Sequence, residues 1–129
     1  MTTRINPMNW TTILIIAAVG AVFFMMKKSG QISAKDALEK LKCGALVIDV
    51  RSPGEFSSGC LAKAINIPLD EIEITVPKRV KDKNQVLLLH CASGMRSGVA
   101  KQKLKGMGYT NVFNLGSYGR AESLLKQKP

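Results

Sequence analysis

Residues 86–89 are Val-Leu-Leu-Leu, an apolar run in which no polar residue alternates with the hydrophobic ones. A strand with this pattern is expected at the centre of a parallel sheet, because helices cover both faces of such a sheet. Short runs rich in β-branched residues predict further strands at 46–50, 64–67 and 112–114. The chain therefore needs helices on both sides of a parallel sheet.

The segments between these strands have helical patterns. Ser33 is a candidate N-cap for a helix that runs to Lys42, with Asp36 three residues after the cap and Gly44 beyond the end. Further helices are expected at 97–107 and 120–126, and weak helical turns at 70–74 and 77–81. Strands that alternate with helices predict an α/β fold with a parallel sheet.

The N-terminal part of the chain has a different composition. No charge occurs in the 22 residues between Arg4 and Lys27, and residues 13–26 are 14 consecutive apolar or glycine residues. With Trp10 at one end and lysines at the other, this pattern predicts a transmembrane helix at about 10–26. We expect two parts, an N-terminal segment at 1–28 and a folded domain at 29–129.

A cleaved signal peptide is the alternative interpretation of the apolar segment. The sequence disfavours it, because Lys-Lys-Ser-Gly follows the segment where a cleavage site with small residues would stand. Lysines are concentrated after the segment, and only Arg4 precedes it. The positive-inside rule then predicts that the domain after the helix lies in the cytoplasm. We expect a single-pass protein of a bacterial inner membrane, with its helix in contact with lipid.

Charge and cysteine content exclude several classes of protein. The net charge is +10, but the basic residues are spread along the chain, so we expect no nucleic-acid partner. Three cysteines are too few for a disulfide scaffold. One histidine and no paired cysteines disfavour a zinc site. We therefore expect no metal and no cofactor.

The segment with the most chemical information follows the apolar run. The strand ends near Cys91, and the six residues 91–96 connect it to the helix expected at 97–107. Ligands bind beyond the carboxyl ends of parallel strands, and a helix N-terminus favours an anion or a thiolate. Gly94 allows the loop amides to point inward, and Arg96 adds a cation. This arrangement predicts a reactive thiolate at Cys91 in an anion-binding loop.

His90 is a poor candidate for a catalytic partner of Cys91. Neighbouring residues of a strand point to opposite faces of the sheet, so we expect His90 to point away from Cys91. An acyl-transfer dyad of Cys and His is therefore disfavoured. An inert buried cysteine is the other interpretation of Cys91, and the Gly, Arg and Ser that follow it argue against that interpretation.

Four segments of the sequence resemble the rhodanese domain of single-domain sulfurtransferases. They are VIDVRSPGEFSSG, AINIPLDEI, HCASGMRS and LKGMGYTNVFNLG, in the order expected for that family. The resemblance covers about residues 32–125. It implies a five-stranded parallel sheet flanked by helices, and a cysteine that accepts sulfur as a persulfide. A small anionic sulfur donor such as thiosulfate and a thiol or cyanide acceptor are the partners that it implies.

The resemblance also assigns residues to roles. Cys91 is the implied sulfur carrier. The implied substrate-binding loop consists of Ala92, Ser93, Gly94, Met95 and Arg96. Asp49, Arg51 and Glu55 match the first signature of the family, which implies a supporting role. Two departures concern accessory contacts: Gly59-Cys60 replaces the usual Gly-His, and residues 115–120 replace a Gly-Gly stretch followed by Trp.

Two other functions compete with sulfur transfer. Cysteine-dependent phosphatases use a related loop, but they place five residues between Cys and Arg, whereas four lie between Cys91 and Arg96 here. A membrane-tethered persulfide carrier or docking module without turnover is the second alternative. Cys60 is open to a redox role, and Cys43, at the expected end of a helix, is interpreted as a bystander.

Overall fold

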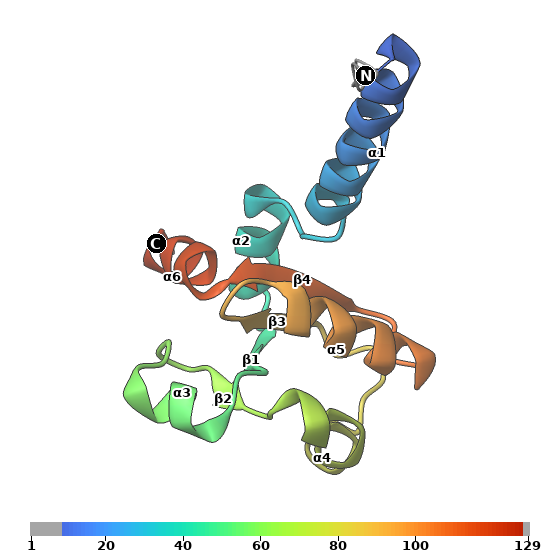
Figure 1. Ribbon diagram of the computed structural model, residues 1–129. Coiled ribbons are helices and arrows are strands. Elements are labelled where there is room, and N and C mark those ends of the chain that lie inside the picture. The colour runs from blue at the N-terminus through green and yellow to red at the C-terminus, as the bar shows by residue number, and fades with distance from the viewer. Residues whose placement is uncertain (1–8, 128–129) are drawn as a thin grey trace. The chain divides into compact units, whose positions relative to one another are not determined.

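The computed structural model describes residues 9–127, without the side chains of residues 24–29. The chain divides into two compact units, residues 1–30 and 31–129. The described part of the first unit contains the helix α1 (Trp10–Ser29), and the second unit holds the other described helices and strands (Figure 1).

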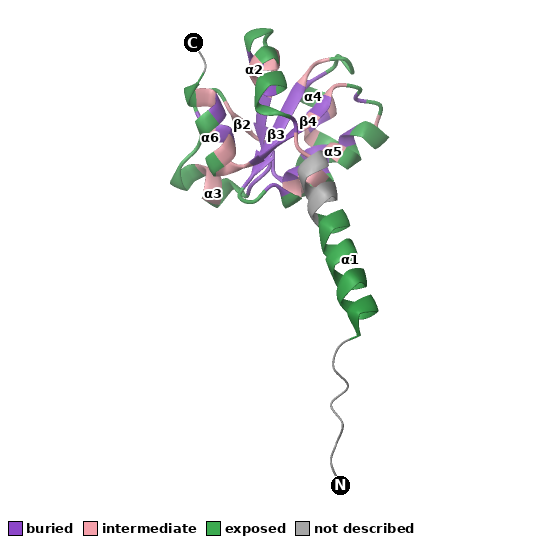
Figure 2. Ribbon diagram, turned by 90° about the horizontal axis from the view of Figure 1, so that it is seen from above, coloured by how far each residue is buried: buried purple, intermediate pink, exposed green. Residues whose placement is uncertain are grey.

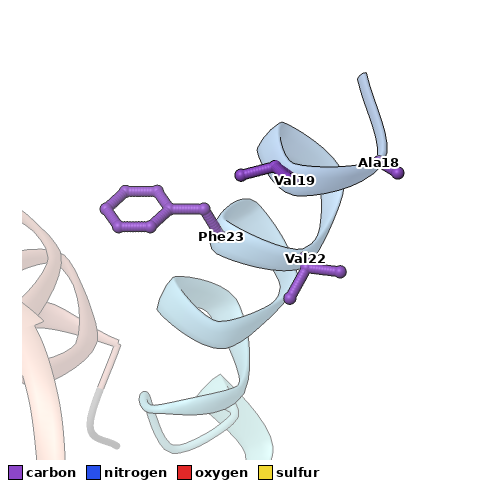
Figure 3. Close-up of a pocket in the computed structure, with 4 residues that line it drawn as sticks. All are labelled: Ala18, Val19, Val22 and Phe23. Carbon is purple, nitrogen blue, oxygen red and sulfur yellow. The ribbon is translucent and has the colours of Figure 1, made fainter. Parts of the chain in front are cut away.

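Apolar side chains of α1 are exposed. Trp10 is 80% exposed and Phe23 is 72% exposed. Figure 3 shows Ala18, Val19, Val22 and Phe23 on the outside of the helix, where they line an apolar pocket. This exposed apolar surface agrees with the hydrophobic composition of the segment.

The structure does not support the predicted transmembrane helix at 10–26. Within the described residues, no helix is long and apolar enough to cross a membrane.

The second unit contains a sheet of parallel strands, in the order β2–β1–β3–β4 among the described residues (Figure 1). The strands are β1 (Leu46–Asp49), β2 (Ile65–Asn66), β3 (Leu87–Cys91) and β4 (Val112–Ser117). Strand β3 is buried along its whole length, as its unbroken apolar run predicted. Figure 2 shows buried residues concentrated on the strands and exposed residues on the outer sides of the helices. The predicted α/β fold is confirmed.

Helices cover both faces of the sheet. They are α2 (Ala34–Lys42), α3 (Pro53–Ser58), the 3-10 helix η1 (Leu69–Glu71), α4 (Ile72–Arg79), α5 (Met95–Gly106) and α6 (Tyr118–Lys126). Helices α4 and α5 pack on the face that carries Leu87, Leu89 and Cys91. Helices α2 and α6 pack on the face that carries Leu88. Successive residues of β3 therefore alternate between two hydrophobic clusters, as expected of a strand.

The predicted boundaries of α2 are confirmed. The Ser33 hydroxyl accepts a hydrogen bond from the Asp36 backbone N–H at 3.2 Å, which satisfies one of the unpaired donors at the helix start. After the helix, Gly44 has a φ of +87°, in the left-handed region that glycine adopts without strain. The helix therefore lies where its capping residues place it.

The sheet has four strands in the described part of the chain, where the family resemblance implied five. A fifth position is present only as an isolated parallel bridge between Gln31 and Asn114. The reason is the short connection to α2: Ser33 already caps that helix, so only Gln31 and Ile32 remain to lie beside β4.

Several helices differ in their boundaries from the sequence-based expectation. The turns expected at 70–74 and 77–81 are η1 and α4, and α4 continues through Pro77. Ile72 and Val76 of α4 are both fully buried, so tertiary packing maintains the helix although proline lacks the N–H donor. Helix α5 begins at Met95 rather than at Ser97, because Gly94 is its N-cap.

Candidate active site

Cys91 is the last residue of β3, and its side chain is fully buried. The Gly94 backbone N–H donates a hydrogen bond to the Cys91 Sγ at 3.0 Å. The Ser97 Oγ lies 3.5 Å from the same sulfur. The thiol predicted at the carboxyl end of the central strand is thus held under the first turn of α5.

Two opposing effects act on the pKa of the Cys91 thiol. Burial raises this pKa, whereas hydrogen bonds from Ser97, Gly94 and Ser93 lower it, and the pKa lies below its ordinary value as the net result. A lower pKa increases the fraction of thiolate, which is the nucleophilic form of cysteine. The predicted activation of Cys91 therefore has a structural cause in the loop itself.

Gly94 is required by the geometry of the loop. Its φ is +96°, a left-handed conformation that residues with a Cβ rarely adopt. A Cβ added at Gly94 would lie 3.2 Å from both the Gln31 Nε2 and the Gly116 Cα. Conformation and space together disfavour a side chain at this position, where the backbone N–H donates to the sulfur.

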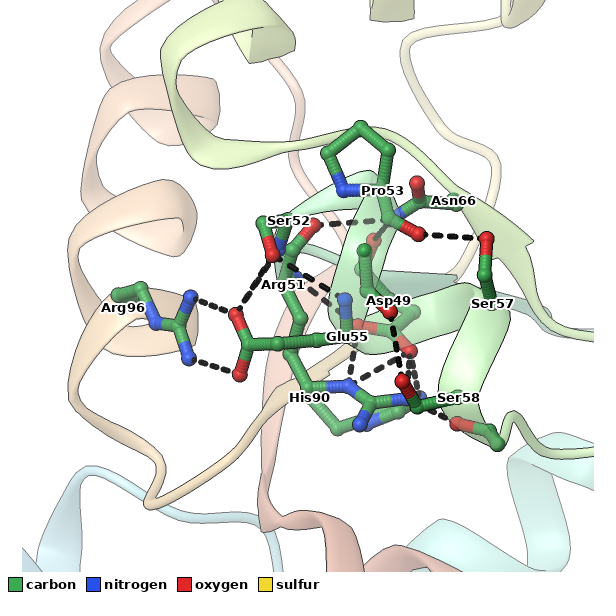
Figure 4. A network of polar contacts seen from close by, with 12 residues as sticks. Asp49, Arg51, Ser52, Pro53, Glu55, Ser57, Ser58, Asn66, His90 and Arg96 are labelled. Atoms are coloured by element: carbon green, nitrogen blue, oxygen red, sulfur yellow. Dashed lines mark hydrogen bonds and ion pairs between the residues drawn. The ribbon is translucent and has the colours of Figure 1, made fainter.

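Arg96 lies in the first turn of α5, and its guanidinium is paired with Glu55. The Arg96 Nη1 and Nη2 donate to the two carboxylate oxygens of Glu55 at 2.7 and 2.9 Å. Arg96 holds the pKa of Glu55 at about 2, with further lowering by bonds from Ser52. Figure 4 shows this two-pronged contact between α5 and α3. Sequence reasoning predicted the cation of Arg96 but not its carboxylate partner.

Helix α3, which the sequence-based prediction left out, positions Glu55. The Ser52 hydroxyl accepts from the Glu55 N–H at 3.2 Å, and the Glu55 carboxylate accepts from the Ser52 N–H at 3.1 Å. This reciprocal pair is a capping box, and its signal, Ser followed three residues later by Glu, is visible in the sequence. The box fixes the start of α3 and orients Glu55 toward Arg96.

Asp49 and Arg51 form a second, buried ion pair. The Arg51 Nη2 donates to the Asp49 Oδ2 at 2.7 Å and to the Gly59 carbonyl at 2.7 Å. The hydrogen bond to Asp49 raises the pKa of Arg51, despite burial. Arg51 also lies over the Tyr118 ring, with the guanidinium carbon 4.6 Å from the ring centre. This pair ties the end of β1 to the loop after α3 (Figure 4).

His90 lies beside this second pair, not beside Cys91. It is paired in register with Asp49, and its Nε2 is 3.9 Å from the Asp49 Oδ2. Burial lowers the pKa of His90, so the ring is neutral at pH 7. The prediction that His90 and Cys91 face opposite sides of the sheet is confirmed. Asp49 and Arg51 support the fold on the His90 side.

The predicted site residues thus separate into three groups. Cys91, Gly94 and Ser97 form the centre, with Arg96 and Glu55 at its edge. The side chains of Ala92, Ser93 and Met95 are exposed on the outside of the loop. Asp49 and Arg51 lie on the other face of the sheet. Ser97 was predicted only as a helix start, and Asn114, which contacts the loop, was predicted only as a strand residue.

The other cysteines lie outside this centre. Cys43 and Cys60 are both exposed, and all three cysteines are free thiols. Cys60 contributes to a surface pocket with Leu61 and Tyr118. Across the described residues, no group of three or more His, Cys, Asp or Glu side chains is arranged to hold a metal ion.

Comparison with known proteins connects this site to a family. The Rhodanese-like domain family matches residues 33–119. The thiosulfate sulfurtransferase PspE of Escherichia coli strain K12 is 44% identical over 69 residues, which are 54% of this chain and 66% of PspE. The chain thus spans somewhat under two thirds of the length of this relative.

Solved structures agree with the sequence match. A rhodanese with anions from E. coli is 39% identical and has a TM-score of 0.58, over 60% of this chain and 91% of that chain. The human single-domain sulfurtransferase TSTD1 is 26% identical and has a TM-score of 0.62, over 78% of this chain and 98% of that chain. From its matched segment, its parallel sheet and the loop around Cys91, the chain belongs to the rhodanese-like domain family.

Proposed function

We propose that this protein is a sulfurtransferase in which Cys91 carries sulfur as a persulfide. One observation supports this most directly: the Cys91 Sγ is buried and accepts a 3.0 Å hydrogen bond from Gly94, with Ser97 beside it. A thiolate in such a cradle is a nucleophile, and the same donors stabilise negative charge on a neighbouring sulfur.

The proposed reaction has two displacements. The Cys91 thiolate attacks the outer sulfur of a donor such as thiosulfate, the sulfur–sulfur bond of the donor breaks, and sulfite leaves with the bonding electron pair. A thiophilic acceptor, such as cyanide or another thiolate, then attacks the outer sulfur of the Cys91 persulfide. The sulfur–sulfur bond to Cys91 breaks, and the thiolate is regenerated. No external oxidant, metal or cofactor enters these steps.

The donor that we propose is small and anionic. The amides around Gly94 and the start of α5 offer hydrogen-bond donors to an anion. Arg96 adds positive charge at the edge, although Glu55 occupies two of its donors. Thiosulfate fits these features, and a persulfide of a small thiol is the other donor of this class.

The burial of Cys91 favours one second candidate, a persulfide carrier that loads once and delivers its sulfur to a docked partner. A thiol with no exposed surface reacts with a small molecule only when the loop moves, which slows turnover with small acceptors without preventing reaction. A steady-state assay separates the two functions. Repeated turnover of thiosulfate with cyanide supports the enzyme, whereas a single loading without turnover supports the carrier.

We also propose that the N-terminal segment holds the protein at a membrane, with the domain in the cytoplasm. The support is the uncharged stretch between Arg4 and Lys27, the exposed apolar side chains of α1 and the lysines that follow. Emission of Trp10, the single Trp of the chain, should shift to shorter wavelength when lipid vesicles are added. Unchanged emission in a full-length chain that needs no detergent would contradict this proposal.

Intact-mass measurement tests the sulfur-carrying role. After treatment with thiosulfate the protein should gain one sulfur atom, and cyanide should remove it. Cys91→Ser should abolish both the gain and turnover, whereas Cys43→Ser should change neither. Cys60→Ser shows whether the exposed Cys60 takes part. If Cys91→Ser acquires cyanide-labile sulfur at the wild-type rate, the proposed function is wrong.

A further inference from the structure

Asn114 of β4 is a buried polar residue that touches the catalytic loop from behind. It is 4% exposed. Its Oδ1 accepts hydrogen bonds from the Ser97 hydroxyl at 2.7 Å and from the Gly116 N–H at 2.8 Å. Its Nδ2 donates to the Gly94 carbonyl at 3.0 Å. One side chain thus connects β4 to two of the residues that contact the Cys91 sulfur.

The orientation of the Asn114 amide is determined by its partners. The Gly116 N–H can only donate, so the oxygen of Asn114 must face it. The Gly94 carbonyl can only accept, so the nitrogen of Asn114 must face that group. A flipped amide would lose both bonds, because its NH2 group would face the Gly116 N–H and its oxygen would face the Gly94 carbonyl. Asn114 is therefore a rigid link with a fixed direction.

The bonds that Asn114 makes bear directly on the thiolate. The Gly94 N–H donates to the Cys91 Sγ at 3.0 Å, and the Ser97 Oγ lies 3.5 Å from the same sulfur. Gly94 has no Cβ and a φ of +96°, so no side chain of its own fixes the loop backbone. Its carbonyl accepts hydrogen bonds from the Asn114 Nδ2 at 3.0 Å and from the Gly98 N–H at 3.1 Å. The Asn114 bond ties this carbonyl to β4, whereas the Gly98 bond ties it to α5.

The backbone of β4 at Asn114 is also hydrogen-bonded to the segment that precedes α2. The Ile32 N–H donates to the Asn114 carbonyl at 3.0 Å, and Arg120 donates to the carbonyls of Ile32 and Leu115. The Gln31 side chain lies against Gly94 and Gly116, where a Cβ on Gly116 would lie 2.9 Å from the Gln31 Nε2. The strand that carries Asn114 is therefore fixed on both sides at this point.

We propose that Asn114 is a positioning residue for the Cys91 thiolate: it holds Gly94 so that the Gly94 N–H donates to the sulfur and stabilises negative charge there. Its effect on turnover rests on the proposed function, but its effect on the thiolate does not. Removing the Asn114 side chain removes a restraint on the Gly94 carbonyl, which weakens the hydrogen bond from the Gly94 N–H to Sγ. The pKa of Cys91 rises as a result.

The test measures the alkylation rate of Cys91 by iodoacetamide as a function of pH. The protein carries Cys43→Ser and Cys60→Ser, so that Cys91 alone reacts. In Asn114→Ala, the midpoint of the pH profile should move up by about one unit, which is about tenfold less thiolate at a pH below the midpoint. The matched control is Asn111→Ala, at the other end of β4, whose Nδ2 donates to the Asn84 carbonyl at 2.8 Å. Its midpoint should equal that of the parent protein.

A second variant keeps the test decisive if Asn114→Ala does not fold. Serine supports the same local turn, in which the side-chain oxygen accepts from the N–H two residues later. Its hydroxyl is too short to replace the amide bond to Gly94. Asn114→Ser should therefore fold and should still raise the midpoint. An unchanged or lowered midpoint in either folded variant overturns the proposal.

The outcomes also distinguish this inference from the proposed function. If the variants shift the midpoint but the wild-type protein never acquires sulfur from thiosulfate, Asn114 positions the thiolate and the proposed function is wrong. If the wild-type protein transfers sulfur but the variants have the parent midpoint, the function stands and the role of Asn114 is wrong.

Discussion

Replacing Arg51 should destabilise the domain more than any change at its surface. Arg51 is 8% exposed, and Asp49, its partner, is fully buried. The Arg51 side chain donates to both oxygens of Asp49, at 2.7 to 3.1 Å, and to the Gly59 carbonyl. Arg51→Ala leaves the Asp49 carboxylate in the interior without its cation.

The size of the stability loss in Arg51→Ala follows from the unpaired charge of the Asp49 carboxylate. Breaking a buried ion pair by removing one partner costs about 3–5 kcal/mol, because the remaining charge keeps its desolvation penalty. For a domain of this size, each 1 kcal/mol lowers Tm by about 4–8 °C. The expected loss in Arg51→Ala is thus more than about 12 °C. Arg51→Lys retains the charge but loses the planar fork, so its loss should be smaller.

Urea denaturation followed by circular dichroism measures this loss. The matched control is Arg79→Ala, because Arg79 is an exposed residue at the end of α4 and should change the unfolding free energy by less than about 0.5 kcal/mol. Folded Arg51→Ala should retain the alkylation profile of Cys91, since Asp49 and Cys91 face opposite sides of the sheet. A loss below about 1 kcal/mol would refute the reasoning, because it would mean that Asp49 finds water or another partner.

Three further predictions concern the loop. Glu55→Gln should free the Arg96 guanidinium and lower KM for thiosulfate by about threefold. Arg96→Ala should raise this KM, and Arg96→Lys should give a value between those of the wild type and Arg96→Ala. Equal KM values in steady-state kinetics would mean that the Arg96–Glu55 pair does not contact the donor. Gly94→Ala should lose about 1–2 kcal/mol of stability and slow Cys91 alkylation, because its φ is +96°. Gly106→Ala, in the same helix with open space around it, should be neutral in both measurements. Because the pKa of Cys91 is lowered from the ordinary thiol value of 9.0, alkylation should persist below that pH and fall only as pH drops through the lower value, and a midpoint at or above 9.0 would contradict this.

Local sequence patterns predicted the centre of the site because they depend on neighbouring residues only. The apolar run at 86–89 placed β3, and its alternation separated Cys91 from His90. Likewise, Ser33 and Gly44 fixed the ends of α2. In each case the physical cause, burial or capping, acts within a few residues of the chain.

Contacts between distant segments were not predictable in the same way. The bond from Asn114 to Gly94 joins residues 20 apart, and the pair of Arg96 with Glu55 joins residues 41 apart. Both depend on which strand lies beside which and on where α3 begins. Helix α3 has six residues, too few to show helical periodicity, so its capping box was the only local signal. The fifth strand that the resemblance implied is reduced to one bridge for a related reason, because the cap of α2 at Ser33 leaves few residues to pair with β4.

The structure also changes the account of how the thiolate is stabilised. The sequence suggested that the helix start, the loop amides and the cation of Arg96 would act together, but the two terminal nitrogens of Arg96 donate to Glu55. The groups that lower the pKa of Cys91 most are the Ser97 hydroxyl and the N–H groups of Ser97, Gly94 and Ser93. These are short-range dipoles in contact with the sulfur.

This difference has a measurable consequence. Dissolved salt screens charges that act through solvent, with a Debye length of about 10 Å at 0.1 M and about 3 Å at 1 M. It has little effect on a buried hydrogen bond, and both the sulfur and Ser97 are fully buried. The alkylation midpoint of Cys91 should therefore stay constant between these two salt concentrations. Asp82→Asn, an exposed change remote from the loop, serves as a control for nonspecific charge effects. An upward shift of the wild-type midpoint in high salt, absent from Arg96→Ala, would show that Arg96 stabilises the thiolate through its charge and that the loop dipoles do not suffice.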